Sequence, residues 1–453
     1  MKVVKFGGTS LANAEQIKKV FEIVVADPNR KIVVVSAPGK RYSKDTKVTD
    51  LLIACAQSWL EQRCDEALFD AVMNRYRSIT DELGITELIM NRITDDLRAL
   101  LQENQDNPDQ FMDAIKASGE DNNAKVVAAY FQYRGIAAEY VNPGEAGLLV
   151  SNEAGNAQVL PDSYERLSKL KDRKGILIFP GFFGHTRDGE IRTFPRSGSD
   201  ITGSILANAI SADLYENYTD VDAVFSVNPM IVQNPKEIST LTYREMRELS
   251  YAGFSVLHDE ALIPAFRAGI PVNIKNTNNP GAPGTMIVSQ RKQTNGPVVG
   301  IASDNDFCSI YVSKYLMNRE IGFGRKLLHI LEELHLSYEH VPSGIDDLTV
   351  ILRQNQLDID REEIILARIK EELEADVVKV EHNLSLIMIV GEGMRSNIGT
   401  MARASKALAG VGVNIEMINQ GSSEVSMMFG VKEEQEKLAV KALYEEFFVA
   451  VSV

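Results

Sequence analysis

The sequence predicts a mainly parallel α/β domain followed by two smaller α+β units, and three observations carry that prediction. Short apolar runs alternate with amphipathic stretches over the first 300 residues, which is typical of parallel sheets covered by helices. The stretch 276–297 is rich in Asn, Pro and Gly and breaks both periodicities, as a domain boundary does. Beyond it, residues 310–344 recur at 387–421, which indicates an internal repeat with a period of 77 residues.

Within the first 300 residues, the apolar runs predict strands and the helical periodicity predicts helices. The strands are expected at 3–6, 31–36, 135–141, 175–179, 212–218 and 270–275. The helices are expected at 14–26, 49–60, 121–134, 201–210 and 243–252. Residues 61–118 are almost wholly helical and polar in pattern, and we interpret them as a scaffold insertion packed against the sheet.

Each copy of the repeat has the same order: a strand, a loop, an Ile-Gly pair that opens a helix, a strand, a turn with glycine, a strand and a closing helix. The recurring residues are Ile310, Ile321, Gly322, Leu331, Glu339 and Gly344, and then Ile387, Ile398, Gly399, Leu408, Glu416 and Gly421. Two copies that only pack on each other would explain the pattern. A loop that delivers a helix amino terminus beside a strand can also receive an anion or an amino acid. At this point binding and packing are comparable interpretations.

Composition and charge exclude one class of partner. The 453 residues are 44% hydrophobic and 25% charged, which is enough apolar material for two or three domains with sizeable cores. The 48 Lys and Arg against 63 Asp and Glu give a formal charge of -15, which argues against nucleic acid held by bulk charge. Residues 301–453 carry most of this excess, with 15 basic and 25 acidic residues.

The cysteines and the hydropathy pattern predict a cytoplasmic protein. Cys55, Cys64 and Cys308 cannot form a disulfide framework and lie in no CxxC pair, which fits a reducing compartment. The amino terminus is a short apolar run followed by glycines, not a secretion signal, and no window reaches 18 apolar residues. We therefore expect no membrane and no nucleic acid among the partners.

The first chemical motif is Lys5-Phe6-Gly7-Gly8-Thr9-Ser10, between the first strand and the first helix. Two glycines let backbone N–H groups approach a phosphate, the lysine supplies a positive charge, and the helix dipole that follows favours an anion. An ordinary strand-to-helix turn with a lysine would have the same letters. The sequence has no GxxxxGK[ST], which disfavours a P-loop. The segment Gly391-x-Gly393-x-x-Ser396 lacks the third glycine of the dinucleotide pattern, which disfavours a Rossmann site.

Five motifs in order, over nearly the whole chain, resemble those of bacterial aspartokinases of the monofunctional, lysine- and threonine-sensitive type. They are KFGGTS at 5–10, Ser118-Gly119-Glu120, Arg196-Ser197-Gly198-Ser199-Asp200, Thr219-Asp220-Val221-Asp222 and Gly421-Ser422-Ser423-Glu424. The resemblance implies an amino acid kinase fold at 1–297, a three-layer α/β/α sandwich with a mainly parallel sheet. It also implies two ferredoxin-like ACT domains, each βαββαβ, at 298–383 and 384–453.

The resemblance implies that the γ-phosphoryl group of MgATP moves to the side-chain carboxylate of L-aspartate and gives 4-phospho-L-aspartate. This is the first step of lysine, threonine, methionine and diaminopimelate biosynthesis. Positioning and charge stabilisation dominate phosphoryl transfer, so the site needs cations and amides on the phosphates rather than a strong base. Mg²⁺ is expected with ATP, and no metal site of the protein's own is predicted.

The resemblance assigns catalysis to Lys5, which stabilises the transferring phosphoryl group, and to Asp200, which orients that lysine. A carboxylate at a helix amino terminus would also stabilise the helix, and the two roles are compatible. Arg196 is assigned to the α-carboxylate of aspartate and Glu120 to its α-ammonium, although each alone would more often be a surface residue. The hydroxyl contacts to the substrate are assigned to Thr49 and Ser199.

The nucleotide is expected at the glycine motif and at the loop 219–229. Many relatives have Tyr, Asp and Arg where this chain has Phe225, Asn228 and Met230, so a hydroxyl and a charge are absent here. Lys275 is the candidate that would supply the missing charge. The residues assigned to the nucleotide are Lys5, Gly7, Gly8, Thr9, Ser36, Thr219, Asp220, Phe225, Asn228 and Lys275.

The resemblance gives the repeat a regulatory meaning, because ACT domains bind amino acid effectors where a helix start meets a neighbouring strand. Lysine, threonine or both are the expected effectors, and binding between two chains implies a homodimer or a higher homo-oligomer. Inhibition would be a bias between open and closed catalytic arrangements. The residues assigned are Met317, Ile321, Gly322, Glu339 and Ser343 in the first copy, and Asn397, Ile398, Gly399, Asn414 and Ile415 in the second.

Two alternatives stay open. One is an amino acid kinase for glutamate, N-acetylglutamate, carbamate or a nucleoside monophosphate, which the paired repeat and the expected ammonium recognition by Glu120 disfavour. The other is a non-catalytic amino acid sensor in which the kinase half is only scaffold. The departures at Phe225, Asn228 and Met230 keep this alternative open, whereas intact Lys5, Glu120, Arg196 and Asp200 argue against it.

Overall fold

The computed structural model describes residues 1–85, 87–103, 105–254, 257–258, 260–291, 296–421 and 425–449. The chain divides into two compact units, which are described separately. The first unit contains Met1–Val224, Glu237–Arg247 and Ser255–Lys292, and the second contains Phe225–Lys236, Glu248–Phe254 and Gln293–Val453. Among the described residues, no helix has both the length and the apolar character needed to cross a membrane.

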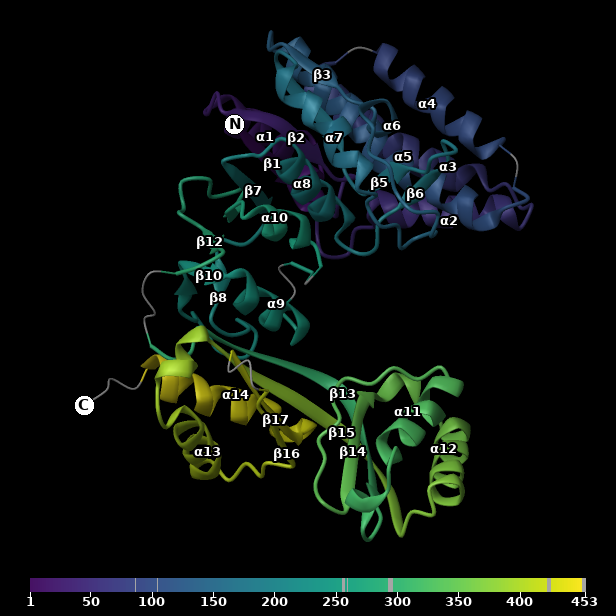
Figure 1. Ribbon diagram of the computed structural model, residues 1–453. Helices are drawn as coiled ribbons and strands as arrows, with labels where there is room; N and C mark the ends of the chain where they lie inside the picture. Colours follow the sequence, from purple (N-terminus) through teal and green to yellow (C-terminus); the bar gives the residue numbers. More distant parts are fainter. Residues whose placement is uncertain are drawn as a thin grey trace. The chain divides into compact units, whose positions relative to one another are not determined.

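The first unit is built on an eight-stranded sheet with the strand order β10-β12-β11-β7-β1-β2-β4-β3 (Figure 1). The six strands from β11 to β3 are parallel, whereas β12 runs antiparallel to β11 at one edge. All six predicted strands have counterparts among the eight, and the predicted mainly parallel α/β class is confirmed. The strands are β1 (Lys2–Phe6), β2 (Arg30–Val35), β3 (Ala138–Tyr140), β4 (Ile176–Pro180), β7 (Leu214–Thr219), β10 (Thr240–Thr242), β11 (Val272–Asn276) and β12 (Thr285–Val288).

Two small two-stranded sheets accompany the main sheet, and the sequence did not predict their strands. They consist of β5 (Phe183–His185) with β6 (Ile191–Thr193), and β8 (Val224–Phe225) with β9 (Glu237–Ile238). Strands of two or three residues are too short for the alternation of apolar and polar residues to be recognised.

Helices cover both faces of the main sheet. One face carries α1 and α5, which pack on Val4, Phe6 and Val35, and the other carries α8, which contacts β1, β2 and β7. The helices of the first unit and its border are α1 (Ala14–Val25), α2 (Val48–Leu60), α3 (Glu66–Leu83), α4 (Glu87–Leu101), α5 (Pro108–Tyr133), α6 (Pro143–Ala146), α7 (Asp162–Ser168), α8 (Gly198–Ala209), α9 (Tyr243–Tyr251) and α10 (Ile263–Ala268).

The predicted insertion forms α3, α4 and the first half of α5. The helix expected at 121–134 is only the carboxyl-terminal half of α5, which begins at Pro108 after the cap Asn107. Buried polar residues such as Asp113 and Glu120 hide the helical period of the amino-terminal half, which explains the late predicted start.

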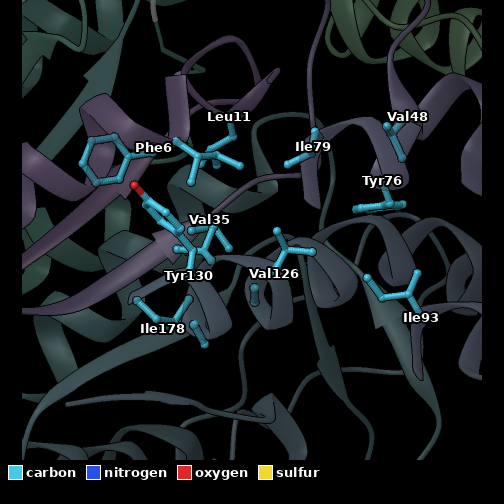
Figure 2. Close-up of a cluster of buried hydrophobic side chains, with 14 of the residues drawn as sticks. Phe6, Leu11, Val35, Val48, Tyr76, Ile79, Ile93, Val126, Tyr130 and Ile178 are labelled. Atoms are coloured by element: carbon cyan, nitrogen blue, oxygen red, sulfur yellow. The ribbon is translucent and has the colours of Figure 1, made fainter. Parts of the chain in front are cut away.

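A single hydrophobic cluster joins this insertion to the sheet (Figure 2). Phe6 of β1 stacks on Tyr218 of β7 with ring centroids 4.9 Å apart. The cluster continues through α5 into α3 and α4, so the predicted packing of the insertion is confirmed. The members labelled in Figure 2 are Phe6, Leu11, Val35, Val48, Tyr76, Ile79, Ile93, Val126, Tyr130 and Ile178.

The second unit contains one five-stranded antiparallel sheet with the order β14-β13-β15-β17-β16. Its strands are β13 (Gly300–Ser313), β14 (Asp347–Arg353), β15 (Val377–Val390), β16 (Met417–Asn419) and β17 (Ser426–Lys432). Its helices are α11 (Phe323–Glu333), α12 (Ile359–Glu372), α13 (Thr400–Gly410) and α14 (Glu436–Tyr444). The expected antiparallel α+β character of this region is confirmed.

The two copies of the repeat share strands instead of forming two separate sheets. A first lobe has its core under α11 and α12 and includes Ile310, while a second lobe has its core under α13 and α14 and includes Ile301 and Ile387. Both β13 and β15 therefore pass through both lobes. The expected boundary at 383/384 falls inside β15 rather than in a linker.

Candidate active site

The glycine motif forms a tight turn at the carboxyl end of β1. The N–H of Gly7 donates to the Tyr218 carbonyl of β7 at 3.1 Å, and a short 3₁₀ helix starts at Gly8. A methyl group added to Gly8 would lie 3.1 Å from the Ala37 oxygen, and one added to Gly39 would lie 2.4 Å from the Gly8 carbonyl carbon. Two chain segments therefore touch backbone to backbone here, which requires glycine.

Lys5 and Asp200 form a nearly buried ion pair beside this turn. Lys5 Nζ lies 2.6 Å from Asp200 Oδ1, and both side chains are about 10% exposed. Asn217 of β7 donates to the same oxygen at 2.7 Å. Asp200 stands in the first turn of α8, a helix entered through Ser197 with a φ of 64°. The predicted pairing of Lys5 with Asp200 therefore exists in the fold.

Glu120 is a buried carboxyl group close enough to Lys5 to be affected by its charge. It is 6% exposed, and its Oε2 has no hydrogen-bond partner among the residues that the structure describes. Burial raises the pKa of Glu120 to about 8, and this increase is opposed by the N–H groups of Ala37 and Glu120 and by the Lys5 charge. A buried carboxyl oxygen without a partner is a natural receptor for a cationic group of a ligand.

The other expected substrate residues are Arg196 in the loop before α8, Ser199 in the first turn of α8 and Thr49 in α2. Ser199 is 7% exposed and packs against Gly181, where an added methyl group would lie 2.6 Å from the serine hydroxyl oxygen. Arg196 is exposed and pairs with no carboxylate in the part of the chain that the structure describes. Thr49 is the half-buried second residue of α2.

Several expected nucleotide residues lie at the same edge of the sheet. Ser36 follows β2 and donates its N–H to the Phe6 carbonyl at 3.3 Å. Thr219 ends β7, and its hydroxyl donates to the carboxylate of Asp220 at 3.2 Å. Because parallel strands end at one edge, these residues and Gly7 belong to one border of the first unit.

Of the other expected nucleotide residues, one lies on another face of this sheet and two belong to the second unit. Lys275 pairs in register with Tyr218, whereas Lys5 pairs with Asn217, the residue before Tyr218. Successive residues of a strand point to opposite faces, so the side chain of Lys275 lies on the face of the sheet opposite to that of Lys5. The Lys275 Nζ donates to the Ala282 carbonyl at 2.8 Å. Phe225 and Asn228 belong to the second unit, where the Asn228 amide oxygen accepts the N–H of Met230 at 2.9 Å.

The expected effector residues divide between exposed loops and lobe interiors. Ile321 and Ile398 are both fully exposed, and each precedes a glycine with positive φ that caps α11 or α13. The φ values of these caps, Gly322 and Gly399, are 81° and 90°. Met317 is instead 7% exposed in the first core.

The remaining effector residues have local partners or line a hollow. Glu339 binds the Tyr251 hydroxyl and lies 3.6 Å from Arg353 Nε. Ser343 lines a hollow of about 620 Å³ on the sheet of the second unit. Asn397 donates to the Gly393 carbonyl at 2.7 Å and Asn414 to Glu416 at 2.9 Å, while Ile415 packs on the second core. Of the last motif, Ser422, Ser423 and Glu424 lie outside the described residues.

Two residues of the site could not be recognised from the sequence. Asn217 is 2% exposed and donates a hydrogen bond to Asp200. In the sequence it is recognisable only as a polar residue within a predicted strand. Phe182 has a φ of 77°, an unusual value for an aromatic residue, and its ring fills the space beside Gly198. No residue pattern announces a backbone conformation of this kind.

Comparison with known proteins gives consistent matches over the whole chain. Residues 1–276 match the amino acid kinase family, and residues 387–447 match an ACT domain. Aspartokinase 3 of Bacillus subtilis (strain 168) is 68% identical over 453 residues, with 100% of both chains covered.

Two solved structures resemble the chain. The crystal structure of Clostridium acetobutylicum aspartate kinase has a TM-score of 0.89 and 37% identity and covers 99% of this chain and 100% of that one. Escherichia coli aspartokinase III, solved in complex with aspartate and ADP, has a TM-score of 0.78 and 24% identity, with 99% and 100% covered, and shares the fold.

Proposed function

The chain belongs to the amino acid kinase family and, within it, to the aspartokinases, and from that membership we propose its reaction and the residues that perform it. The enzyme transfers the γ-phosphoryl group of MgATP to the side-chain carboxylate of L-aspartate. A carboxylate oxygen forms the new bond to phosphorus, the bond to the β-phosphate oxygen breaks, and ADP leaves with the bonding electrons. The products are 4-phospho-L-aspartate and ADP.

The observation that carries this proposal is the pair Lys5 and Asp200 beside the glycine turn, at 2.6 Å. Charge moves over the phosphoryl oxygens in the transition state, and a fixed ammonium group stabilises it without reorganisation. Asp200 pairs with that ammonium, and Asn217 donates to Asp200 and holds the carboxylate in place. The glycine turn lies next to this ammonium, since a methyl group added to Gly7 would be 3.5 Å from Lys5 Nζ. Mg²⁺ arrives with ATP as part of the substrate.

Recognition of aspartate rests on Glu120 and Arg196. The unpartnered Glu120 Oε2 supports its role with the α-ammonium group, because a ligand cation would satisfy an otherwise isolated oxygen. The unpaired guanidinium of Arg196 is available for a bidentate bond to the α-carboxylate. Thr49 and Ser199 add hydroxyl contacts in this proposal.

The nucleotide is proposed to bind at Gly7, Gly8, Thr9, Ser36, Thr219 and Asp220, at the edge where these strands end. Phe225 and Asn228 stay predictions for its remaining contacts. Lys275 has weaker support, because its side chain lies on the opposite face from Lys5.

The reaction is tested with MgATP and L-aspartate, with the acyl phosphate trapped by hydroxylamine. Lys5→Met should lower turnover by about 10² or more, because one cation on the phosphoryl group contributes a few kcal/mol. Lys2→Met is the matched control: Lys2 lies on the same strand but points to the other face, where it pairs with Asp27 at 2.8 Å. Equal activity in wild type and Lys5→Met would contradict the assignment.

A panel of acceptors in the same assay separates the alternatives. Turnover with glutamate, N-acetylglutamate, carbamate or a nucleoside monophosphate but not with aspartate would replace the proposed substrate. No turnover with any acceptor, combined with saturable amino acid binding, would favour the sensor.

Regulation by lysine, threonine or both is the second part of the proposal. The exposed Ile321 and Ile398 support contacts to a second chain, since full exposure of such side chains is costly. We propose a homodimer or a higher homo-oligomer, with effectors at the assigned residues of both copies. Calorimetric titration with each amino acid should give saturable heat that weakens in Asn414→Ala, and mass measurement with and without ligand gives the assembly.

We propose the domain limits 1–297, 298–383 and 384–453 for the order of the repeats along the sequence. In the fold, β13 and β15 serve both lobes. We also propose that the enzyme works in the cytoplasm, which its free Cys55, Cys64 and Cys308 support.

A further inference from the structure

The segment 36–47, which joins β2 to α2, lies directly behind the glycine turn. The N–H of Gly39 donates to the Gly8 carbonyl at 2.8 Å, and no side chain fits between the two backbones. The segment then leads into α2, where the N–H of Val48 donates to the Pro38 carbonyl at 3.1 Å. Any shift of this segment would move Gly8.

A buried arginine of the insertion holds this segment. Arg75 of α3 is 5% exposed and donates to the Gly39 carbonyl, and it also reaches the Thr46 carbonyl at 3.3 Å. Its Nη1 lies 2.9 Å from Asp45 Oδ2. Asp45 in turn accepts the backbone N–H and the guanidinium of Arg41, at 2.8–2.9 Å. One guanidinium thus binds both ends of the loop.

The same helix also holds the second wall of the site. Tyr76, next to Arg75 in α3 and labelled in Figure 2, is fully buried and donates to the Gly119 carbonyl at 2.8 Å. Gly119 directly precedes Glu120. Two adjacent residues of α3 therefore fasten the backbone behind the phosphate turn and the backbone that carries the proposed ammonium receptor.

We propose that Arg75 is a positioning residue for phosphoryl transfer, which makes the insertion part of the catalytic apparatus rather than scaffold alone. It keeps the segment 36–47 pressed on Gly8, so that the turn next to Lys5 stays in its reactive arrangement. The inference rests on the proposed function. Its physical basis is that misplacement of reacting groups by about 1 Å can cost roughly 10² in rate.

A merely structural role for Arg75 would have a different signature. Loss of a buried charge pair lowers stability, yet the fraction that remains folded would then turn over normally. Positioning predicts that kcat falls for the folded enzyme while the KM for aspartate changes little, because Glu120 and Arg196 stay in place. The KM for ATP can rise as well, since Gly8 and Ser36 belong to the proposed nucleotide site.

The test compares Arg75→Met, Arg75→Lys and Arg30→Met in the full chain, each measured well below its melting temperature. Arg30→Met is the matched control, because Arg30 is a largely buried arginine, 12% exposed, that pairs with Glu216 at 2.6 Å near the amino ends of the strands. Arg75→Met should lower kcat by about tenfold or more with the KM for aspartate within about threefold, and Arg75→Lys should recover part of that loss. Arg30→Met should keep kcat within about twofold.

A second readout does not depend on activity. Lys40 and Lys44 are exposed within the segment and offer cleavage sites to trypsin. Arg75→Met should be cut there at least about tenfold faster than wild type and Arg30→Met. Loss of the contacts of Arg75 with the segment 36–47, here called the latch, raises the fraction of molecules in which this segment is detached. Unchanged cutting, or kcat within twofold of wild type in Arg75→Met, would overturn the proposal. An inactive wild type would instead refute the proposed function, while the trypsin comparison would still decide whether the latch exists.

Discussion

Glu120 illustrates how a single side chain can link substrate binding to pH. Burial raises the pKa of this carboxyl group to about 8, so in the free enzyme it is protonated below that pH. The α-ammonium group of aspartate pairs with the ionised form. The affinity for aspartate should therefore increase as Glu120 loses its proton.

The catalytic efficiency with aspartate should depend on pH through this carboxyl group. With saturating MgATP, kcat/KM for aspartate should rise with pH up to about 8 and level off above it. Glu120→Gln should lower kcat/KM by roughly 10- to 100-fold, the value of a charged hydrogen bond, and remove the rise. Steady-state kinetics from pH 6.5 to 9 measure both effects, and a profile of Glu120→Gln that still rises through pH 8 would contradict the assignment.

The same carboxyl group should affect stability with a definite sign. Its folded-state pKa of about 8 lies above its ordinary value of 4.5, so between these values the folded state holds the proton more tightly. The stability contributed by this group is present at low pH and is lost as the pH rises towards 8. Glu120→Gln should therefore melt higher than wild type at pH 8.5 and similarly at pH 5. Calorimetry at the two values tests this, and an equal difference at both would count against it.

At the scale of elements, the close contact of two loops determines the geometry of the site. Gly39 has no room for a side chain, because its neighbour across the gap is the Gly8 backbone. Unlike the end of a flexible side chain, backbone atoms there cannot move aside. The contact therefore depends on which residues stand at positions 8 and 39, which are far apart in the sequence.

We expect Gly39→Ala to reduce both stability and turnover. Overpacking of this kind typically costs about 1–3 kcal/mol, which urea unfolding measures. Gly281→Ala is the control, since an added methyl group at Gly281 would meet nothing within 4 Å. If Gly39→Ala unfolded at the wild-type urea concentration and kept its turnover, the two loops would not be as tightly packed as described.

The sequence could predict elements whose residues form a regular pattern, and it could not predict contacts made by the fold. The strands β1, β2 and β4 were recognisable because each is a largely apolar run, whereas β7 and β11 also contain polar residues such as Asn217 and Lys275. The pair of Lys5 with Asp200 was expected from motif order alone. Arg75 was assigned to scaffold, because a polar helical stretch gives no sign that one arginine is buried and reaches a loop 36 residues earlier.

At the scale of the whole chain, the shared strands couple the two lobes of the second unit. In β13 the register shifts between Asp304 and Phe307, and Asp306 has a φ of 65°. The strand nevertheless continues, so that Ile301 serves one core and Ile310 the other. Loss of one core should therefore loosen the strands on which the other depends.

We predict that Leu327→Ala, a fully buried change in the first core, destabilises both lobes. Its cost should be about 2–5 kcal/mol, as for other leucines in cores. Hydrogen-exchange mass spectrometry should find faster exchange in α13 and α14 as well as in α11. Leu438→Ala, at a leucine 47% exposed, should change little. Faster exchange confined to the first lobe would mean that the shared strands do not couple the two.

Strand sharing also alters how this regulatory region can be cut and exchanged. The second lobe is discontinuous in the chain, because its core takes Val227, Val298 and Ile301 from before the first lobe and its other buried members from after it. A fragment that starts at residue 384 would lack β13, one of the two strands that pair with Ile389. The first lobe, by contrast, draws its core from residues 308–380 without interruption. The first lobe could therefore be exchanged between relatives as one continuous stretch of chain. The second lobe must keep its parts from before and after the first lobe.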